Sequence, residues 1–317
     1  MNKYLLTVVL ACTMTSLMAC DVCGVFLGIR PNDRSSSFGL FYRWRQLRGD
    51  LSPVSLLAKH GDPAPEGSAP QHYEEQFLVL EARGEVWLGQ RWSILASVPV
   101  VNNYQSVDQV AAADVYGVAD PFVLGRYVVV NTRGNDVAGR AVHRLSLGLG
   151  LKAPLGMSNV SYNGERVDED LQPGTSTWDG LASVEYQVRR NALGASLAAS
   201  GRFNTANDEG YQLGHGMGTT VEAFYLVGKE ALRWGPSLGA YGEYTAKDQL
   251  DGTPVPYTGT STLFSHLGSR VWWRNWMLSV YHQYAVSADN GALMVPNRQR
   301  LILGITYNLN KNEPKTR

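Results

Sequence analysis

A two-residue alternation of apolar and polar side chains is the feature that most constrains the fold of this chain. In one segment, Leu145, Leu147, Leu149 and Leu151 alternate with Arg144, Ser146, Gly148, Gly150 and Lys152. A period of two places successive side chains on opposite faces of a β-strand, whereas a helix repeats every 3.6 residues. About twelve such segments follow one another, near residues 35–45, 74–88, 91–103, 119–131, 144–152, 177–190, 191–204, 215–228, 231–246, 261–273, 276–287 and 300–309.

The length of these segments favours strands that cross a membrane. Each is roughly 10–15 residues long, against about 9–11 for a tilted strand that spans a bilayer and about five or six in most soluble sheets. In hydrocarbon every backbone N–H and C=O must be paired within the protein, and a sheet meets that demand by closing. We therefore predict an all-β fold, a transmembrane antiparallel up-and-down β-barrel of about 12 strands over residues 35–309.

The connections between the segments alternate in length. Short ones lie near residues 89–90, 132–139, 190–191, 228–231 and 274–275, and long ones near 49–73, 104–118, 153–176, 205–214, 247–260 and 288–297. Outer-membrane barrels have short periplasmic turns and long external loops. An even strand count then places both chain ends in the periplasm.

Tryptophan gathers at the ends of the predicted strands. Near the short connections lie Trp87, Trp92, Trp234, Trp272, Trp273 and Trp276, and near the long ones lie Trp44 and Trp178. Indole rings prefer the boundary between membrane and water, so we expect two aromatic girdles.

The amino terminus has the pattern of a targeting segment. Lys3 precedes an apolar stretch from Leu5 to Ala11, and the following segment from Ser16 to Ala19 ends on a small residue. We predict a secretory signal peptide over 1–19, a periplasmic segment over 20–34, and a polar tail over 310–317.

Cys20 and Cys23 form a Cys-x-x-Cys element directly after the predicted cleavage site. A local disulfide or an inert pair fits an oxidising compartment. Lipidation of Cys20 and a thiolate site for a soft metal such as copper remain open. Thioredoxin-like chemistry is the weakest reading, because no βαβ pattern follows the motif.

Charged residues on the polar faces of the strands must avoid lipid, so parity assigns them to the lumen. The lumen-lining candidates are Arg43, Glu81, Arg83, Glu85, Lys152, Glu185, Glu222, Glu243 and Arg270. The same charges could instead form a ladder of ion pairs that fills the lumen. The chain carries 28 basic and 28 acidic side chains, and a net charge of zero does not favour nucleic acid as a partner.

Several glycine-based motifs resemble those of a known transporter family. They are Ser97-Val98-Pro99-Val100, the segment Tyr116–Pro121, the segment Leu147–Gly156, the segment Leu171–Ser176 and the loop Asn204–Gly214. Together they resemble the outer-membrane transporters grouped as the MetA-pathway of phenol degradation family, over roughly residues 75–230. The resemblance implies a β-barrel that passes small, often hydrophobic compounds, and it offers no catalytic residues to carry over. Cys20 and Cys23 are not part of that pattern.

The leading functional hypothesis is a porin-like outer-membrane channel or transporter of a Gram-negative bacterium for a small, possibly hydrophobic, solute. The alternative is a barrel-anchored binding or structural protein that uses external loops or the Cys20/Cys23 segment. Enzyme activity is not expected, since His143, His266 and His282 are not paired with a recognisable Ser or Asp motif. No cofactor is predicted. The expected partners are outer-membrane lipid, a small-molecule solute and the barrel-assembly machinery, and the oligomeric state is left open.

Overall fold

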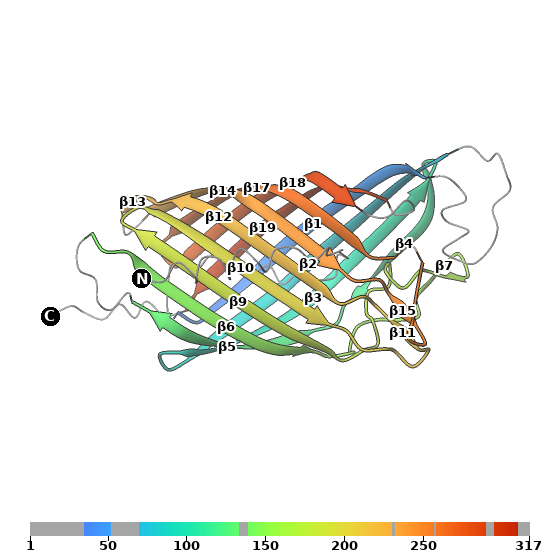
Figure 1. The fold of residues 1–317 in the computed structure, drawn as a ribbon, viewed down its shortest axis with the longest axis horizontal. Coiled ribbons are helices and arrows are strands. Elements are labelled where there is room, and N and C mark those ends of the chain that lie inside the picture. Colours follow the sequence, from blue (N-terminus) through green and yellow to red (C-terminus); the bar gives the residue numbers. More distant parts are fainter. Residues whose placement is uncertain are drawn as a thin grey trace, which may run out of the picture.

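The computed structural model describes residues 35–51, 70–132, 139–229, 232–256, 258–289 and 295–309. Its main feature is a closed antiparallel barrel of 12 strands, which confirms the predicted fold class. Figure 1 shows the strands tilted along the barrel wall. They are β1 (Ser37–Leu51), β2 (Gln71–Leu88), β3 (Trp92–Val107), β5 (Phe122–Asn131), β6 (Val142–Lys152), β9 (Asp179–Arg190), β10 (Leu193–Phe203), β12 (Gly216–Tyr225), β14 (Leu232–Thr245), β17 (Thr260–Trp273), β18 (Trp276–Asp289) and β19 (Asn297–Asn308).

The predicted signal peptide, the segment 20–34 with its two cysteines and the tail 310–317 lie outside the described residues. Within the described ranges, no helix has the length and apolar character needed to cross a membrane.

The first and last strands pair with each other and close the sheet. On one side of β1, Phe38 lies opposite Tyr307 and Arg45 lies opposite Arg300 of β19. On the other side β1 pairs with β2 along its whole length. The remaining strands pair in order around the ring, including β12 with β14. Among the described strands, the barrel wall therefore has no unpaired edge.

The two ends of the barrel differ in the way that the connections predict. Turns at 89–91, 191–192 and 274–275 join strands at one end, where Asn191 and Arg274 adopt φ angles of 56° and 54°. Figure 1 shows the opposite end built up by extra strands. These are β7 (Ser161–Tyr162), β8 (Glu165–Arg166), β11 (Tyr211–Gln212), β15 (Gln249–Leu250) and β16 (Thr253–Pro254). We call this the loop end.

The segment 104–118 differs from its prediction as a loop. It forms the end of β3 and all of β4 (Val110–Val118), which pair as a hairpin beyond the barrel wall. Asp108 and Gln109 at the turn have φ angles of 49° and 69°, and positive φ at both central residues matches the twist of a tight hairpin. The next strand begins at Phe122 rather than at residue 119, since β4 gives way to β5 along the same edge of β3. A three-residue strand, β13 (Val227–Lys229), adds to β14.

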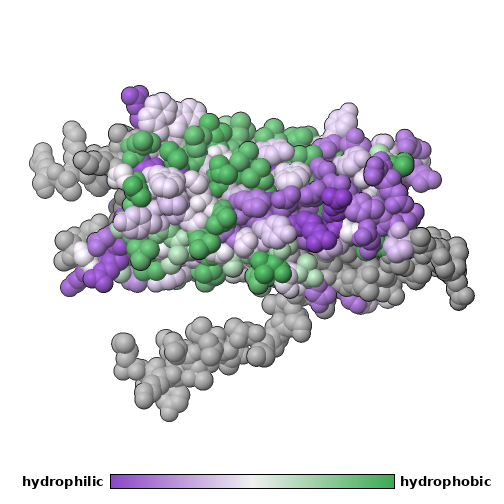
Figure 2. Space-filling view, turned by 90° about the horizontal axis from the view of Figure 1, so that it is seen from above, coloured by the Kyte–Doolittle hydropathy of each residue, from purple (hydrophilic) through white to green (hydrophobic). Residues whose placement is uncertain are grey.

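The alternation in the sequence becomes an outward apolar surface and an inward polar one. Leu147, Leu149 and Leu151 of β6 are exposed, whereas Arg144, Ser146 and Lys152 are buried. Figure 2 shows hydrophobic surface over the barrel wall and hydrophilic surface gathered at the loop end. This distribution is the one that a lipid environment requires of a barrel.

The tryptophan girdles hold only in part. Trp92, Trp178, Trp234, Trp273 and Trp276 are exposed at strand ends. Trp272 is instead buried. Successive side chains of β17 point to opposite faces of the sheet, and since Trp273 points outward, Trp272 points into the barrel. The ring of Trp87 lies 5.8 Å from the guanidinium carbon of Arg144, so it packs against an inward-facing cation.

A charge on the outward face should destabilise the barrel in lipid. Leu149→Arg in β6 places a guanidinium on the apolar wall, which costs up to about 2–4 kcal/mol near the bilayer midplane. Leu155→Arg is the matched control, since Leu155 is equally exposed but lies beyond the end of β6 and should cost about 0–1 kcal/mol. Urea titration of vesicle-folded protein, followed by gel mobility without boiling, measures both. Equal losses of unfolding free energy would contradict a lipid-facing wall.

Candidate functional site

The lumen-lining candidates lie on the inward parity of their strands. All of them are buried except Arg43 and Glu185, which are partly exposed. Their charged groups meet in separate clusters, several of which join strands that are not neighbours in the sheet. A contact that skips a strand must run over the inner surface of the barrel. Their role in lining a solute path stays a prediction.

Glu81 of β2 is the centre of the first cluster. Its two carboxylate oxygens lie 2.6 Å from Nη2 of Arg83 and 3.1 Å from Nη2 of Arg43. Ser97 of β3 also donates its hydroxyl to Glu81. A fully buried carboxylate needs such compensation, because burial without partners would be costly.

Arg126 of β5 joins the second cluster and was not among the predicted residues. It donates to Glu85 of β2 and, at 3.1 Å, to Glu185 of β9. Each of these contacts passes over one intervening strand. Arg126 has the inward parity that selected the other candidates, so the same rule could have found it.

Glu222 of β12 forms a third cluster with residues of β17. Its carboxylate lies 3.0 Å from Nη2 of Arg270 and 3.7 Å from Nε2 of His266. The other ring nitrogen of His266 contacts the side-chain amide of Gln283 at 3.0 Å. The fully buried His266 is thus part of an interior polar network.

Glu243 of β14 connects strands that lie far apart in the ring. It lies 3.0 Å from Arg45 of β1 and 2.5 Å from Arg300 of β19. Three strands separate β14 from β1 in the sheet, and two separate it from β19. These three residues, which we call the cross-lumen triad, therefore narrow the lumen. Arg45 and Arg300 were not predicted as site residues.

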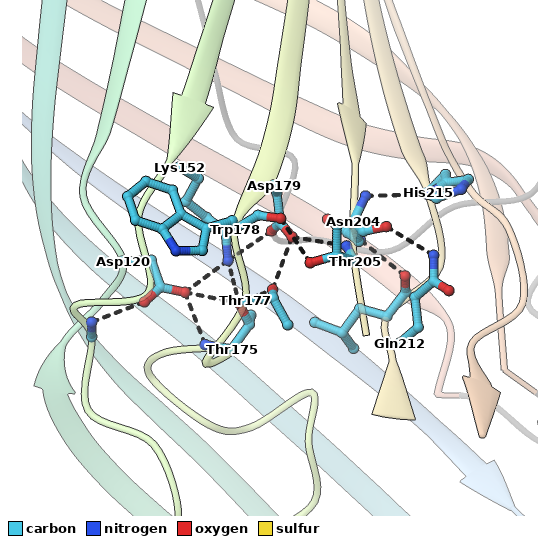
Figure 3. Close-up of polar contacts among 12 residues, drawn as sticks. Asp120, Lys152, Thr175, Thr177, Trp178, Asp179, Asn204, Thr205, Gln212 and His215 are labelled. Atoms are coloured by element: carbon cyan, nitrogen blue, oxygen red, sulfur yellow. Dashed lines mark hydrogen bonds and ion pairs between the residues drawn. The ribbon is translucent and has the colours of Figure 1, made fainter. Parts of the chain in front are cut away.

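Lys152, at the end of β6, joins two carboxylates at the loop end of the wall. Its ammonium nitrogen lies 2.7 Å from Asp120 and 2.7 Å from Asp179. Figure 3 shows Thr175 and Thr177 turned toward the same carboxylates. Asp120 lies between β4 and β5, and Asp179 begins β9, so one cation ties three parts of the wall together.

Asp120 also holds the long connection 153–178 to the barrel. It accepts the backbone N–H groups of Gly156 and Thr175, each at 2.8 Å. Burial by itself would raise the pKa of Asp120, but the charge of Lys152 and these hydrogen bonds hold that pKa below its ordinary value. The carboxylate is thus kept ionised at neutral pH.

The connection 153–178 folds back against the interior of the β3–β4 hairpin. Leu171 and Val167 pack on Ala113 and Val115 of β4. Asn103 of β3 donates its side-chain amide to the carbonyl of Leu171 at 2.9 Å. This connection therefore covers part of the loop end of the lumen.

A cavity of about 300 Å³ lies inside the barrel, among the connection 153–178, Lys152 and two arginines of the cross-lumen triad. Apolar side chains form much of its wall, namely Leu47, Phe77, Val79, Pro99, Val101, Phe122, Leu181, Val255 and Ile302. Charged side chains share the lining, among them Arg202 of β10, which sequence reasoning did not select. Such a mixture suits a small ligand with a large apolar part.

Candidate metal ligands and the histidines of the strands are the other chemically relevant groups among the described residues. No cluster of three or more His, Cys, Asp or Glu side chains there could hold a metal, and the predicted ligands Cys20 and Cys23 lie outside those residues. His143 contacts the hydroxyl of Tyr186 at 2.7 Å, and His282 contacts Gln299 at 3.4 Å. These contacts resemble ordinary polar packing between strands.

Comparison with known proteins supports the fold. No family model matches the chain, and no curated protein matches it. An outer membrane channel from Pseudomonas putida F1 is similar in structure, with a TM-score of 0.60 and 14% identity over 88% of this chain and 99% of that chain. The beta domain of the Bordetella autotransporter Brka has a TM-score of 0.45 and 12% identity, over 87% of this chain and 100% of that chain. A Pseudomonas aeruginosa FadL homologue has a TM-score of 0.38 and 11% identity, over 88% of this chain and 91% of that chain. The first similarity shows a shared barrel fold, and the resemblance to the phenol-pathway family stays a prediction.

Removing the cation that joins Asp120 to Asp179 should loosen the connection 153–178. Lys152→Met leaves two buried carboxylates without their cation, and breaking a buried pair in this way costs about 3–5 kcal/mol. Cleavage at Glu165 or Glu169 by a glutamate-specific protease should become at least about tenfold faster, while the folded-barrel gel shift is kept. Lys247→Met is the matched control, because Lys247 is exposed. Equal cleavage of the two variants would contradict the assigned role.

Proposed function

We propose that this protein is a channel in the outer membrane of a Gram-negative bacterium for a small, largely apolar solute. The observation that carries the proposal is the cavity inside the barrel. Apolar side chains form much of its wall, and charged side chains share that wall with them. A solute on its way through the barrel would meet this cavity after passing the loop end. The outward apolar wall fits lipid as the surrounding partner.

The size of the conducted solute follows from the side chains that narrow the lumen. The cross-lumen triad lies next to the cavity, since Arg45 and Arg300 line it. Its ion pairs connect strands far apart in the ring. A lumen bridged in this way suits single small molecules rather than the bulk diffusion of a general porin.

The alternative function, a barrel that anchors a binding segment, depends on Cys20 and Cys23. These residues lie outside the described part of the chain, so the alternative stays a prediction. Metal titration of the intact protein against a Cys20→Ser/Cys23→Ser variant separates it from transport.

The channel is tested by planar-bilayer conductance of the purified full chain in potassium chloride. The triple variant Arg45→Ala/Glu243→Ala/Arg300→Ala removes the whole cross-lumen triad, so that no charge is left buried and unpaired. We expect a small conductance for the unchanged protein and a larger one for this variant.

A matched triple substitution outside the cavity lining provides the control. Arg48 donates to His72, and His72 contacts Asp50, in exposed contacts at the ends of β1 and β2. None of the three residues lines the cavity, so Arg48→Ala/Asp50→Ala/His72→Ala should leave the conductance unchanged. If neither the unchanged protein nor the cross-lumen variant conducts, while both keep the gel shift of a folded barrel, the channel proposal is wrong.

A further inference from the structure

Arg202 differs from the other cations that line the cavity. It lies near the end of β10 with only 3% of its surface exposed. None of its three guanidinium nitrogens has a hydrogen-bond partner among the described residues, and no ion pair is formed there. A buried guanidinium carries five N–H donors and is always charged, so leaving all of them unused is unfavourable.

The other cationic side chains of the cavity are already paired with carboxylates. Arg43 pairs with Glu81, and Lys152 pairs with Asp120 and Asp179. Arg45 and Arg300 both pair with Glu243. Within the described part of the cavity lining, Arg202 is therefore the cation that retains its full capacity for an anion.

Two acidic residues, one on the neighbouring strand β9 and one in the cavity lining, already bind other groups. Leu181 is the register partner of Arg202 on β9, and Asp179 faces the interior two residues away from it. Figure 3 shows Asp179 turned toward Lys152, Thr177 and Thr205. Asp248, which also lines the cavity, accepts from the hydroxyl of Tyr211 and the N–H of Gly214.

The space beside Arg202 also favours a ligand. Its register partner on β12 is Gly216, which has no side chain to lie over the guanidinium. The cavity that Arg202 lines includes Phe122 and Leu181, which belong to one apolar cluster. A cation without a partner among the described residues thus lies beside an apolar part of the cavity wall.

We propose that Arg202 binds the carboxylate of a small apolar monocarboxylate held in this cavity. This inference rests on the proposed function and names the class of its solute. A guanidinium binds a carboxylate through two parallel hydrogen bonds, which an alcohol or an amine cannot reproduce. The volume of about 300 Å³ admits a single ring or a short chain, at the lower limit of ligand pockets.

The test is calorimetric titration of the detergent-folded full chain with three probes of equal size, namely benzoate, benzyl alcohol and benzylammonium. Benzoate should bind most tightly to the unchanged protein. Arg202→Gln should weaken benzoate binding roughly 10–100-fold, because a charge-assisted pair is lost, and should leave benzyl alcohol within about twofold. Arg202→Lys, which keeps the charge but not the two-point geometry, should give an intermediate value.

Arg166→Gln is the control, because Arg166 is a paired arginine outside the cavity lining; it should bind all three probes as the unchanged protein does. Since Arg202 has no hydrogen-bond partner to lose among the described residues, Arg202→Gln should also keep the gel shift of the folded barrel. If that variant does not fold, the preference of the unchanged protein among the three probes and the value for Arg202→Lys still decide.

The proposal is overturned if benzoate binds no more tightly than benzyl alcohol, or if Arg202→Gln binds benzoate as the unchanged protein does. The conductance experiment decides the channel separately. Benzoate binding that depends on Arg202 in a barrel without conductance would support this site and reject the channel. Conductance without benzoate binding would support the channel and reject this site.

Discussion

The pairing of β1 with β19 is the constraint on which the rest of the structure depends. A bilayer offers no water to an unpaired N–H or C=O group, so a sheet in lipid must have no open edge. The register from Phe38–Tyr307 to Arg45–Arg300 supplies that closure. Once the ring is closed, every strand has one face toward lipid and one toward the interior, and the side chains must sort accordingly. The apolar wall and the charged interior are two results of the same closure.

Closure also determines how the interior charges are arranged. A carboxylate such as Glu81 or Glu243, turned away from lipid into a narrow lumen, is stable there only beside cations. The partners come from strands that the curvature of the wall brings face to face, as with Glu243, Arg45 and Arg300. Near the loop end the charges are reversed, because there one cation, Lys152, lies between the carboxylates of Asp120 and Asp179. Arg202 stands out against this pattern, because the described interior pairs the other cavity cations and leaves this one available.

The period of two predicted the twelve strands of the barrel, and it located the segment 144–152 and its inward residues closely. It could not predict partners, because Glu243 meets Arg45 at a separation of 198 residues and Arg300 at 57, and such contacts depend on the tilt of the strands and the size of the ring. Asp120 was not selected although it fell in the predicted strand 119–131, and in the structure it lies between β4 and β5, where strand alternation does not apply. The predicted loop at 104–118 was wrong for β4, because small and polar residues such as Ala113 and Asp114 mask the alternation of that strand. Trp272 was assigned to a girdle by its position near a turn, although parity turns it inward.

Closure of the ring is tested most directly by a disulfide between the first and last strands. Leu40 and Ile305 lie opposite each other on the outward face, and directly opposed residues of an antiparallel pair are close enough to be bridged. In a background where Cys12, Cys20 and Cys23 are serine, Leu40→Cys/Ile305→Cys protein in the outer-membrane fraction should form an intrachain disulfide on oxidation, seen as a reducible shift of the boiled protein on a gel. Cysteines that remain reduced, or that link only separate chains, would contradict a closed barrel.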